Sequence, residues 1–439
     1  MIKICAYVQG KYAKQTYSNE NFNVRQWVGL QVIIDSLTRS GYQVEYAGAA
    51  TAYKYDIVLV SITSDCDWWG FIAERMQWPS GDYTVIVGGA GVLNVRPFLP
   101  FADCFILGRG ENLILDIVRE IQDGGKYKDP SVIWADQFSM DSRYTIRQED
   151  IYPHEVMLTN GKTFNEHAMG CNHKCLFCGY AYQRHSVGND EGFSSGSGLW
   201  TGEQINRESA LLDMHKSGNY DLKYLRITAI DGMSERLRKM VKKPISNEIL
   251  QELFERMATF DKPHQLKIYN IIGYPSETQD DWMEFLEILQ RADAKLVPSK
   301  QWSIVLHCTP FRAMPATPAA CWPMSYINYR GQIAKVLGNG KYKGNIFYQG
   351  NRFWAVEGMG TDSLSTVILS AIAHRGVEAD SDNIRKISLS HKFWHANSAV
   401  RQATLEKYFD VQALFGAFTA DTLPTRNIGT YLPIERAWG

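Results

Sequence analysis

Apolar runs alternate with amphipathic stretches over residues 1–125. Five runs of strand length, several of them continuously apolar, predict β-strands that are buried on both faces. Apolar residues at helical spacing predict helices over 24–37 and 113–121. Strands that alternate with helices indicate a doubly wound parallel sheet, which binds ligands at the carboxyl ends of its strands. The five predicted strands lie within residues 1–8, 42–48, 55–62, 83–89 and 103–108.

A polar segment, residues 126–155, is interpreted as a linker with short strands. A second, less regular alternation of strands and helices follows it and favours a full or partial (β/α) barrel over 156–335. In the two predicted helices, Ser246 is placed as an N-cap, and Ser276 has capping-box spacing to Gln279. Residues 336–439 are predicted to form a C-terminal region that begins with a strand and a helix. The barrel strands are expected within 156–160, 222–231, 266–274 and 302–311, and its helices over 246–257 and 276–292.

Length and charge narrow the class of protein. The chain has 439 residues, enough for two or three domains at roughly 100 to 200 residues per domain. Its net charge of -1 gives no global attraction to nucleic acid or to an anionic membrane. Because it contains no apolar run of about 18 residues and no signal-peptide pattern, we expect a soluble cytoplasmic protein without a membrane partner.

Three of the eight cysteines lie close together, as Cys171, Cys175 and Cys178, at C-x3-C-x2-C spacing. Cytoplasmic thiols stay reduced, so such a cluster indicates metal binding or catalysis before disulfides. Three thiolates on so short a loop can hold an iron-sulfur cube that keeps one iron open. The alternative is a zinc-stabilised binding protein, in which His167, His173 or His185 would be the fourth ligand.

The three cysteines, with Phe177 just before the last of them, resemble the signature of the radical S-adenosylmethionine (radical SAM) enzymes. The resemblance implies a 4Fe-4S cluster whose open iron binds the amino and carboxylate groups of SAM. An electron from the cluster then cleaves SAM to methionine and a 5'-deoxyadenosyl radical, which abstracts hydrogen from a substrate. An electron donor such as flavodoxin or ferredoxin is implied as a partner.

Three later segments resemble the branch of that superfamily that carries cobalamin-binding-like domains. Residues 231–238 with 243–246 are similar to its "E-x-G-S-E-R-L-R … K-x-I-T", and 309–318 to its "P-F … P-x-T-P". Residues 267–278 are similar to its "K-x-Y-x-x-I-G-L-P-x-E-T", with Tyr274 in place of the leucine. The GGE-type motif of the branch is absent, and the short interval after the cysteines suggests a shortened barrel.

The resembling segments supply the candidate SAM-binding residues. Asp231 and Ser234 would receive the amino group or ribose hydroxyls, or belong to a solvated turn. Arg236 and Arg238 would meet the SAM carboxylate, or face solvent at a helix start. Gly273 would let the backbone approach adenine, and Glu277 opens a helix; an ordinary strand-to-helix turn would explain both as well.

The N-terminal domain, residues 1–125, resembles the cobalamin-binding domain of the same branch. Its glycine loops look like "V-G-G-P" and "G-E-G-E", although tight turns are the alternative explanation for them. No D-x-H-x-x-G motif is present, because no histidine precedes His154, so a corrin ligated by a histidine of this domain is excluded. Cobalamin without such a ligand stays open, as does a domain that has lost the cofactor. The candidate residues here are Ser61, Thr63, Gly88, Gly89, Gly108, Gly110 and Glu111.

The expected activity depends on cobalamin. With it, the resemblance implies methylation of an unactivated carbon; without it, a radical rearrangement, isomerisation or other modification of a nucleobase, peptide or small molecule. Trp68 and Trp69 form a pair that looks exposed and would stack on a flat substrate. His307, Arg312 and Tyr329 are weaker candidates for substrate contacts. The catalytic residues and the substrate are not predicted.

Overall fold

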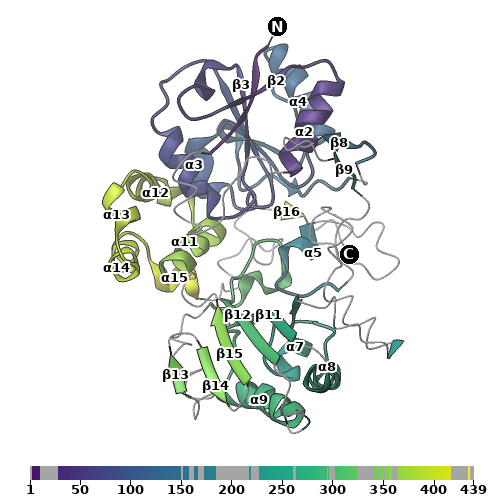
Figure 1. The fold of residues 1–439 in the computed structure, drawn as a ribbon. Coiled ribbons are helices and arrows are strands. Elements are labelled where there is room, and N and C mark those ends of the chain that lie inside the picture. The colour runs from purple at the N-terminus through teal and green to yellow at the C-terminus, as the bar shows by residue number, and fades with distance from the viewer. Residues whose placement is uncertain are drawn as a thin grey trace.

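The fold is described from a computed structural model, shown in Figure 1. Two units with β-sheets lie at the top and bottom of that view, and a group of C-terminal helices lies between them at the left. The structure describes residues 2–9, 28–149, 152–157, 163–166, 173–183, 217–218, 227–260, 264–293, 295, 302–324, 341–343, 346–349, 352–357, 364–416 and 434–435.

The first sheet has six strands in the order β2-β1-β3-β4-β5-β6. The five predicted strands are all present and parallel, which confirms the expected doubly wound sheet. The sixth strand, β6, comes from the segment predicted to be a linker and pairs antiparallel with β5 at the edge. The strands are β1 (Ile4–Tyr7), β2 (Val44–Ala47), β3 (Ile57–Ser61), β4 (Thr84–Gly88), β5 (Cys104–Ile106) and β6 (Val132–Trp134).

Helices cover both faces of this sheet. Every second residue of the strands points to one face of the sheet and packs against α2 (Val28–Arg39) and α4 (Leu113–Gln122). The opposite face packs against α3 (Asp67–Arg75). The first predicted helix, over 24–37, corresponds to α2, which is described from Val28 onward. Residues 24–27 lie outside the described residues. Short 3-10 turns follow at η2 (Ala52–Lys54), η3 (Arg96–Phe101) and η4 (Ala135–Gln137).

The tryptophan pair on α3 corrects one expectation. Trp68 and Trp69 are fully buried, so neither offers a surface for stacking on a substrate. The Trp68 ring stacks on Phe98 at a centroid distance of 4.1 Å, and its Nε1 donates to the carbonyl of Gly91 at 3.0 Å. The pair belongs to the core because α3 packs between the sheet and the C-terminal helices, which sequence alone does not reveal.

The second sheet also has six strands, in the order β10-β11-β12-β15-β14-β13. Its first four strands are parallel and the last two form an antiparallel extension. The sheet continues past residue 335, because β15 pairs with β12 along five residues. In the described residues it is an open sheet. The strands are β10 (Ile227–Ala229), β11 (His264–Ile272), β12 (Trp302–Pro310), β13 (Lys341–Lys343), β14 (Ile346–Gln349) and β15 (Arg352–Glu357).

Among the described residues, three helices accompany the second sheet: α7 (Glu235–Met240), α8 (Asn247–Thr259) and α9 (Gln279–Asp293). The latter two pack on one face of the sheet. Ser246 caps α8 as predicted, since its side chain accepts from the Ile249 amide. The capping box at Ser276 is wrong: α9 begins three residues later, and the Asp281 carboxylate accepts from the Thr278 amide instead, at 2.8 Å.

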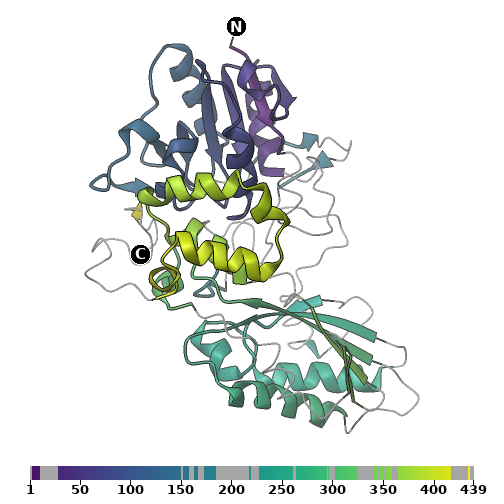
Figure 2. The ribbon, with the colours of Figure 1, turned by 90° about the vertical axis from the view of Figure 1, so that its left-hand side faces the viewer.

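In the described part of the C-terminal region, five helices form a group, of which the first, α11, is the predicted one. Figure 2 shows them stacked between the two sheets. They bind the first unit closely: α12 packs on α3, and the Asn94 side chain donates to the carbonyl of Gly376 at 2.9 Å. One continuous apolar core includes residues of the first sheet, of α7 and of these helices. They are α11 (Leu364–Arg375), α12 (Ser381–Ser388), α13 (His391–His395), α14 (Ser398–Tyr408) and α15 (Val411–Phe415), with η6 (Glu378–Asp380).

Short elements complete the described chain. They are the antiparallel pair β8 (Val156–Met157) and β9 (Thr163–Phe164), the parallel pair β7 (Tyr144–Thr145) and β16 (Ile434–Glu435), α5 (Gly179–Gln183) and η5 (Pro318–Cys321). Among the described residues, no helix combines the length and the apolar character that a membrane span requires.

Candidate functional site

The carboxyl ends of β10, β11 and β12 meet at one edge of the second sheet. The Ile230 amide donates to Tyr269 at 2.9 Å, and the Phe311 amide donates to Ile272 at 2.7 Å, so parallel pairing continues to the strand ends. The segments that follow, beginning at Asp231, Gly273 and Phe311, therefore emerge side by side. Ligands of parallel α/β sheets bind at such an edge.

Two of the three cysteines lie against this edge. Cys175 and Cys178 form one turn, in which the Cys178 amide donates to the Cys175 carbonyl at 3.0 Å. The Leu176 amide donates to Val241 at 3.0 Å, and Leu176 in turn accepts from Ala319 at 3.0 Å. Cys175 is buried and Cys178 is partly exposed. The turn is thus held between the end of α7 and η5, while Cys171 lies outside the described residues.

Tyr274 connects the cysteine turn with the other two segments. Its hydroxyl donates to the carbonyl of Asp231 at 3.1 Å, and its ring lies 6.3 Å from Phe177 between centroids. Burial raises the pKa of Tyr274 well above its usual value, and nearby negative charges, first that of Asp231 and then that of Cys175, add to the shift. This residue was not among the predicted site residues. The sequence did mark this position, because Tyr274 is the residue at which 267–278 departs from the segment it resembles, which has leucine there.

Asp231 occupies a backbone position that few non-glycine residues adopt, with a φ of 48°. Its carboxylate pairs with Lys243 Nζ at 2.6 Å, and the Lys243 side chain is only 2% exposed. The next residue, Gly232, donates its amide to the Asn270 side chain at 2.7 Å. Lys243 and Asn270 thus fix the turn that presents Asp231, and neither was a predicted site residue.

Ser234 and Arg236 are engaged with the protein itself. Ser234 is fully buried, caps α7 by accepting from the Leu237 amide, and donates to Asp281. Arg236 donates to Asp281 Oδ2 at 2.7 Å and to the Ser276 carbonyl at 2.9 Å. Burial acts to raise the pKa of Asp281, but hydrogen bonds from Arg236 and Ser234 outweigh it and lower the pKa. The two residues join α7 to α9, and the Arg236 side chain stays half exposed.

Arg238 is a correction to the expected SAM contacts. It is fully buried, and it donates to the carbonyls of Ile245 at 2.7 Å, Gly232 at 2.9 Å and Met233 at 3.1 Å. Burial lowers its pKa to about 10. Arg238 therefore shapes the turn after Asp231 and is neither solvent-facing nor presented to a ligand.

Glu277 closes the turn at the end of β11. Its carboxylate accepts from the amides of Gly273 at 2.6 Å and Tyr274 at 3.1 Å, and from Trp282 Nε1 at 2.8 Å. Burial raises its pKa to about 7, although these hydrogen bonds favour the charged form. Gly273 has a φ of 82°, which explains the glycine. Glu277 holds the turn in shape, and the turn lies directly beside the cysteines.

The candidate corrin residues serve contacts within the chain. Thr63 donates both its amide and its hydroxyl to Asp67 Oδ2, at 2.9 and 2.8 Å. A Cβ on Gly89 would lie 2.5 Å from the Ile62 carbonyl oxygen, and one on Gly108 would lie 2.4 Å from that of Arg147. These glycines let neighbouring loops of the first unit pack closely against each other. The remaining candidates lie nearby: Ser61 pairs with Gly88 in the sheet, and a Cβ on Gly110 would lie 3.2 Å from Ile106.

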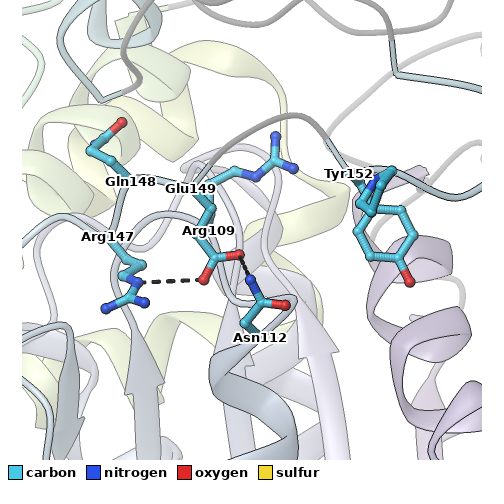
Figure 3. A pocket seen from close by; sticks show the side chains of 7 residues that line it. Arg109, Asn112, Arg147, Gln148, Glu149 and Tyr152 are labelled. Atoms are coloured by element: carbon cyan, nitrogen blue, oxygen red, sulfur yellow. Dashed lines mark hydrogen bonds and ion pairs between the residues drawn. The ribbon is translucent and has the colours of Figure 1, made fainter.

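Glu111, the last of the candidates, belongs to a buried polar network at the end of β5. It pairs with Arg109, which also pairs with Glu166. Beside them lies a pocket of about 550 Å³ (Figure 3), where Glu149 accepts from Asn112 at 2.9 Å and from Arg147 at 3.4 Å. Burial raises the pKa of Glu149, and the charge of Glu111 adds to the shift.

In the part of the chain that the structure describes, no group of three or more histidine, cysteine or acidic side chains is arranged so that it could hold a metal ion. Two of the three predicted thiols nevertheless share one turn beside Tyr274, and thiolates are the donors that iron-sulfur clusters use. The donor set in the described residues therefore fits a cluster, with the third thiol outside them.

Comparison with known proteins finds only a remote similarity to solved structures. No protein-family model matches the chain, and no curated protein matches it. Among solved structures, it is similar to the cobalamin-dependent S-adenosylmethionine radical enzyme OxsB with aqua-cobalamin and S-adenosylmethionine bound, at 9% identity and a TM-score of 0.26. The match covers 98% of this chain and 60% of that one. OxsB with aqua-cobalamin alone gives the same identity and TM-score over 95% and 58%. At this identity and TM-score the similarity is too remote to support an inference about fold, activity or ligands, and this chain spans about 60% of the length of OxsB.

Proposed function

We propose that the chain is a radical SAM enzyme with a 4Fe-4S cluster held by Cys171, Cys175 and Cys178. One observation carries the proposal. The cysteine turn, the Asp231 turn and the Gly273 turn are far apart in the sequence, yet they lie around one residue, Tyr274. These are the segments in which the sequence resembles that superfamily.

The residues of this edge divide into those that present groups and those that hold them. Cys175 and Cys178 would bind iron, and a bound cluster would supply the electron that cleaves SAM. Asp231 lies at the same edge, and its carboxylate, paired with Lys243, would accept a hydrogen bond from the SAM amino group. Glu277 holds the amides of the Gly273 turn, and Gly273, which has no side chain, would let adenine approach the backbone there.

The second sheet would be the partial barrel of such an enzyme, and the face opposite α8 and α9 would receive the substrate. Because no histidine precedes His154 to ligate a corrin, and the candidate glycines of the first sheet serve packing within the chain, we propose hydrogen abstraction without cobalamin. It would begin a rearrangement, isomerisation or other modification of a small molecule, nucleobase or peptide group. The electron would come from a carrier such as flavodoxin or ferredoxin, and the setting would be cytoplasmic.

Reconstitution with iron and sulfide tests this proposal. Under anaerobic conditions, the wild-type chain should bind about four iron atoms and turn brown. Cys178→Ala should lose most of that iron, whereas the matched control Cys321→Ala, outside the cysteine turn, should keep it. A colourless chain that binds one zinc tightly and no iron-sulfur cluster would overturn the proposal in favour of the zinc-stabilised binding protein.

A further inference from the structure

The segment that leads into the cysteine loop is attached to the first unit. Val156 of β8 is 1% exposed and packs in one cluster with Val32 of α2 and with Tyr152. The Tyr152 hydroxyl donates to Asp35 Oδ2 on the same helix, at 2.9 Å. The β8–β9 pair, which precedes residues 167–178 in the chain, is therefore packed against α2 through Val156, and the segment just before the pair is hydrogen-bonded to α2 through Tyr152.

The cysteine loop, residues 167–178, directly follows Glu166. The Glu166 side chain binds Arg109, which lies just after the end of β5. Its two oxygens accept from the two terminal nitrogens of Arg109 at 2.7 and 2.8 Å. The Tyr152 amide donates to the same carboxylate at 2.8 Å. The side chains of Arg109 and Glu166 are only 7% and 10% exposed. A bidentate guanidinium–carboxylate pair fixes orientation as well as distance, and burial protects it from screening by salt.

Arg109 itself is held rigidly. Its amide donates to the Arg147 carbonyl at 3.1 Å, and Gly108 before it permits that approach. Burial acts to lower the pKa of Arg109, but Glu166 and Glu111 outweigh it and raise the pKa, so the guanidinium stays charged. The resembling loop, "G-E-G-E", carries glutamate at this position. A glutamate here would meet the carboxylates of Glu111 and Glu166, so arginine suits this chain's own contact.

The other end of the cysteine loop is fastened to the second unit. Cys175 lies against the Lys242 carbonyl at 3.8 Å, and Leu176 is bonded on both sides to Val241 and Ala319. Residues 167–172, which include Cys171, therefore connect a point fixed by the first unit to a point fixed by the second.

We propose that Arg109 is a positioning residue for the cysteine loop: through Glu166 it fixes where the loop begins. The first unit then contributes to the candidate site by holding the loop. The consequence for the cluster rests on the proposed function, but the contact between Arg109 and Glu166 does not. The two can therefore be tested separately.

The test uses the full chain and the variant Glu166→Gln, which keeps the shape but removes the charge. Its matched control is Glu149→Gln, because Glu149 is a buried carboxylate of the neighbouring pocket with no described contact to the β8–β9 pair. In the metal-free protein, hydrogen exchange over residues 152–178 should become about tenfold faster in Glu166→Gln, since losing a charged hydrogen-bonded pair there weakens local protection. It should stay unchanged in Glu149→Gln. Exchange over 227–260 should be unaffected in both.

A second series measures iron bound after reconstitution. Glu166→Gln and Arg109→Met should lower it several-fold, and Arg109→Lys, which restores the charge without two parallel hydrogen bonds, should fall between Arg109→Met and wild type. If Glu166→Gln does not fold, the two Arg109 variants decide the matter. Exchange in Glu166→Gln equal to wild type, or equal acceleration in Glu149→Gln, would overturn the inference. A wild-type chain that binds no iron would instead refute the proposed function, and hydrogen exchange would still decide the role of Arg109.

Discussion

The hydroxyl of Tyr274 donates a hydrogen bond to the backbone carbonyl of Asp231 at 3.1 Å, across two strands of the second sheet. Both residues are buried, and Asp231 has left-handed backbone geometry. Removing the hydroxyl in Tyr274→Phe leaves a buried carbonyl without this donor. We expect the free energy of unfolding to fall by about 1 to 2 kcal/mol, measured by urea denaturation of the metal-free chain.

The control for that variant is Tyr42→Phe. The Tyr42 hydroxyl donates to Gln122 at 2.8 Å at an exposed position, where water replaces the lost partner. Its effect should stay within about 0.5 kcal/mol. Equal effects of the two substitutions would show that the contact between Tyr274 and Asp231 does not stabilise the turn.

Glu277 makes stability depend on pH. Its pKa is about 7 in the folded chain, above the ordinary 4.5, because the carboxyl is buried. The folded state therefore holds a proton that the unfolded state releases, and the associated stability is complete below about pH 4.5 and lost as the pH rises through 7. Between these values the free energy of unfolding of wild type should fall more steeply than that of Glu277→Gln, by up to about 1.4 kcal/mol per pH unit. Parallel slopes, measured by urea denaturation at several pH values, would contradict this assignment.

Arg238 is expected to be essential to the turn that follows β10. Arg238→Met leaves three buried carbonyls without their donor and should destabilise the chain by about 3 kcal/mol or more. Arg238→Lys should restore part of the loss, because an ammonium reaches fewer of these carbonyls. The exposed Arg119→Met is the control and should change stability by less than about 0.5 kcal/mol. Thermal unfolding distinguishes these outcomes, and a neutral Arg238→Met would refute the structural role.

Asp65 joins three parts of the chain. It follows β3, and its carboxylate accepts from Ser370 on α11, lies 3.0 Å from His374 on the same helix, and lies 3.5 Å from Arg312 after β12. Burial acts to raise the pKa of Asp65, yet Arg312 and His374 outweigh it and hold the pKa well below 3.8. Its contribution is therefore present at neutral pH and lost only in strong acid.

Replacing Asp65 by Asn should therefore destabilise the chain by about 3 to 5 kcal/mol at pH 7. It should also expose residues 364–416 to limited proteolysis, because the contact of α11 with the first unit weakens. Asp116→Asn, which alters an exposed pair with Arg119, should leave the proteolytic pattern unchanged. Resistance of Asp65→Asn equal to wild type would contradict this account. Arg312, first considered for substrate contacts, thus has a structural partner.

Sequence patterns predicted the first sheet well, because each of its parallel strands is a buried apolar run with a helix beside it. They predicted short strands in the linker but did not place β6 in the first sheet, since an edge strand of three residues within a polar segment carries little periodicity. They misjudged Trp68 and Trp69, because burial depended on C-terminal helices that lie about 300 residues later. The capping box at Ser276 failed because a carboxylate inside the helix, Asp281, supplied the cap.

The candidate site shows a similar division. The segments around Asp231 and Gly273 were identified from local pattern, and the strand ends bring them together. The sequence does not predict which polar side chains point into the protein. Arg238 donates hydrogen bonds to buried backbone carbonyls and Ser234 caps a buried helix end, and both roles depend on tertiary packing. Lys243, Asn270 and Arg109 were missed for the same reason, since each acts through a partner distant in sequence.

The central claim is tested most directly by SAM cleavage. The anaerobically reconstituted chain, reduced with dithionite and given SAM, should release 5'-deoxyadenosine, quantified by mass spectrometry against an internal standard. Cys178→Ala should release none above the protein-free control, and Cys321→Ala should match wild type. Absence of 5'-deoxyadenosine from a wild-type chain that carries a full cluster, or equal release by Cys178→Ala, would contradict the account.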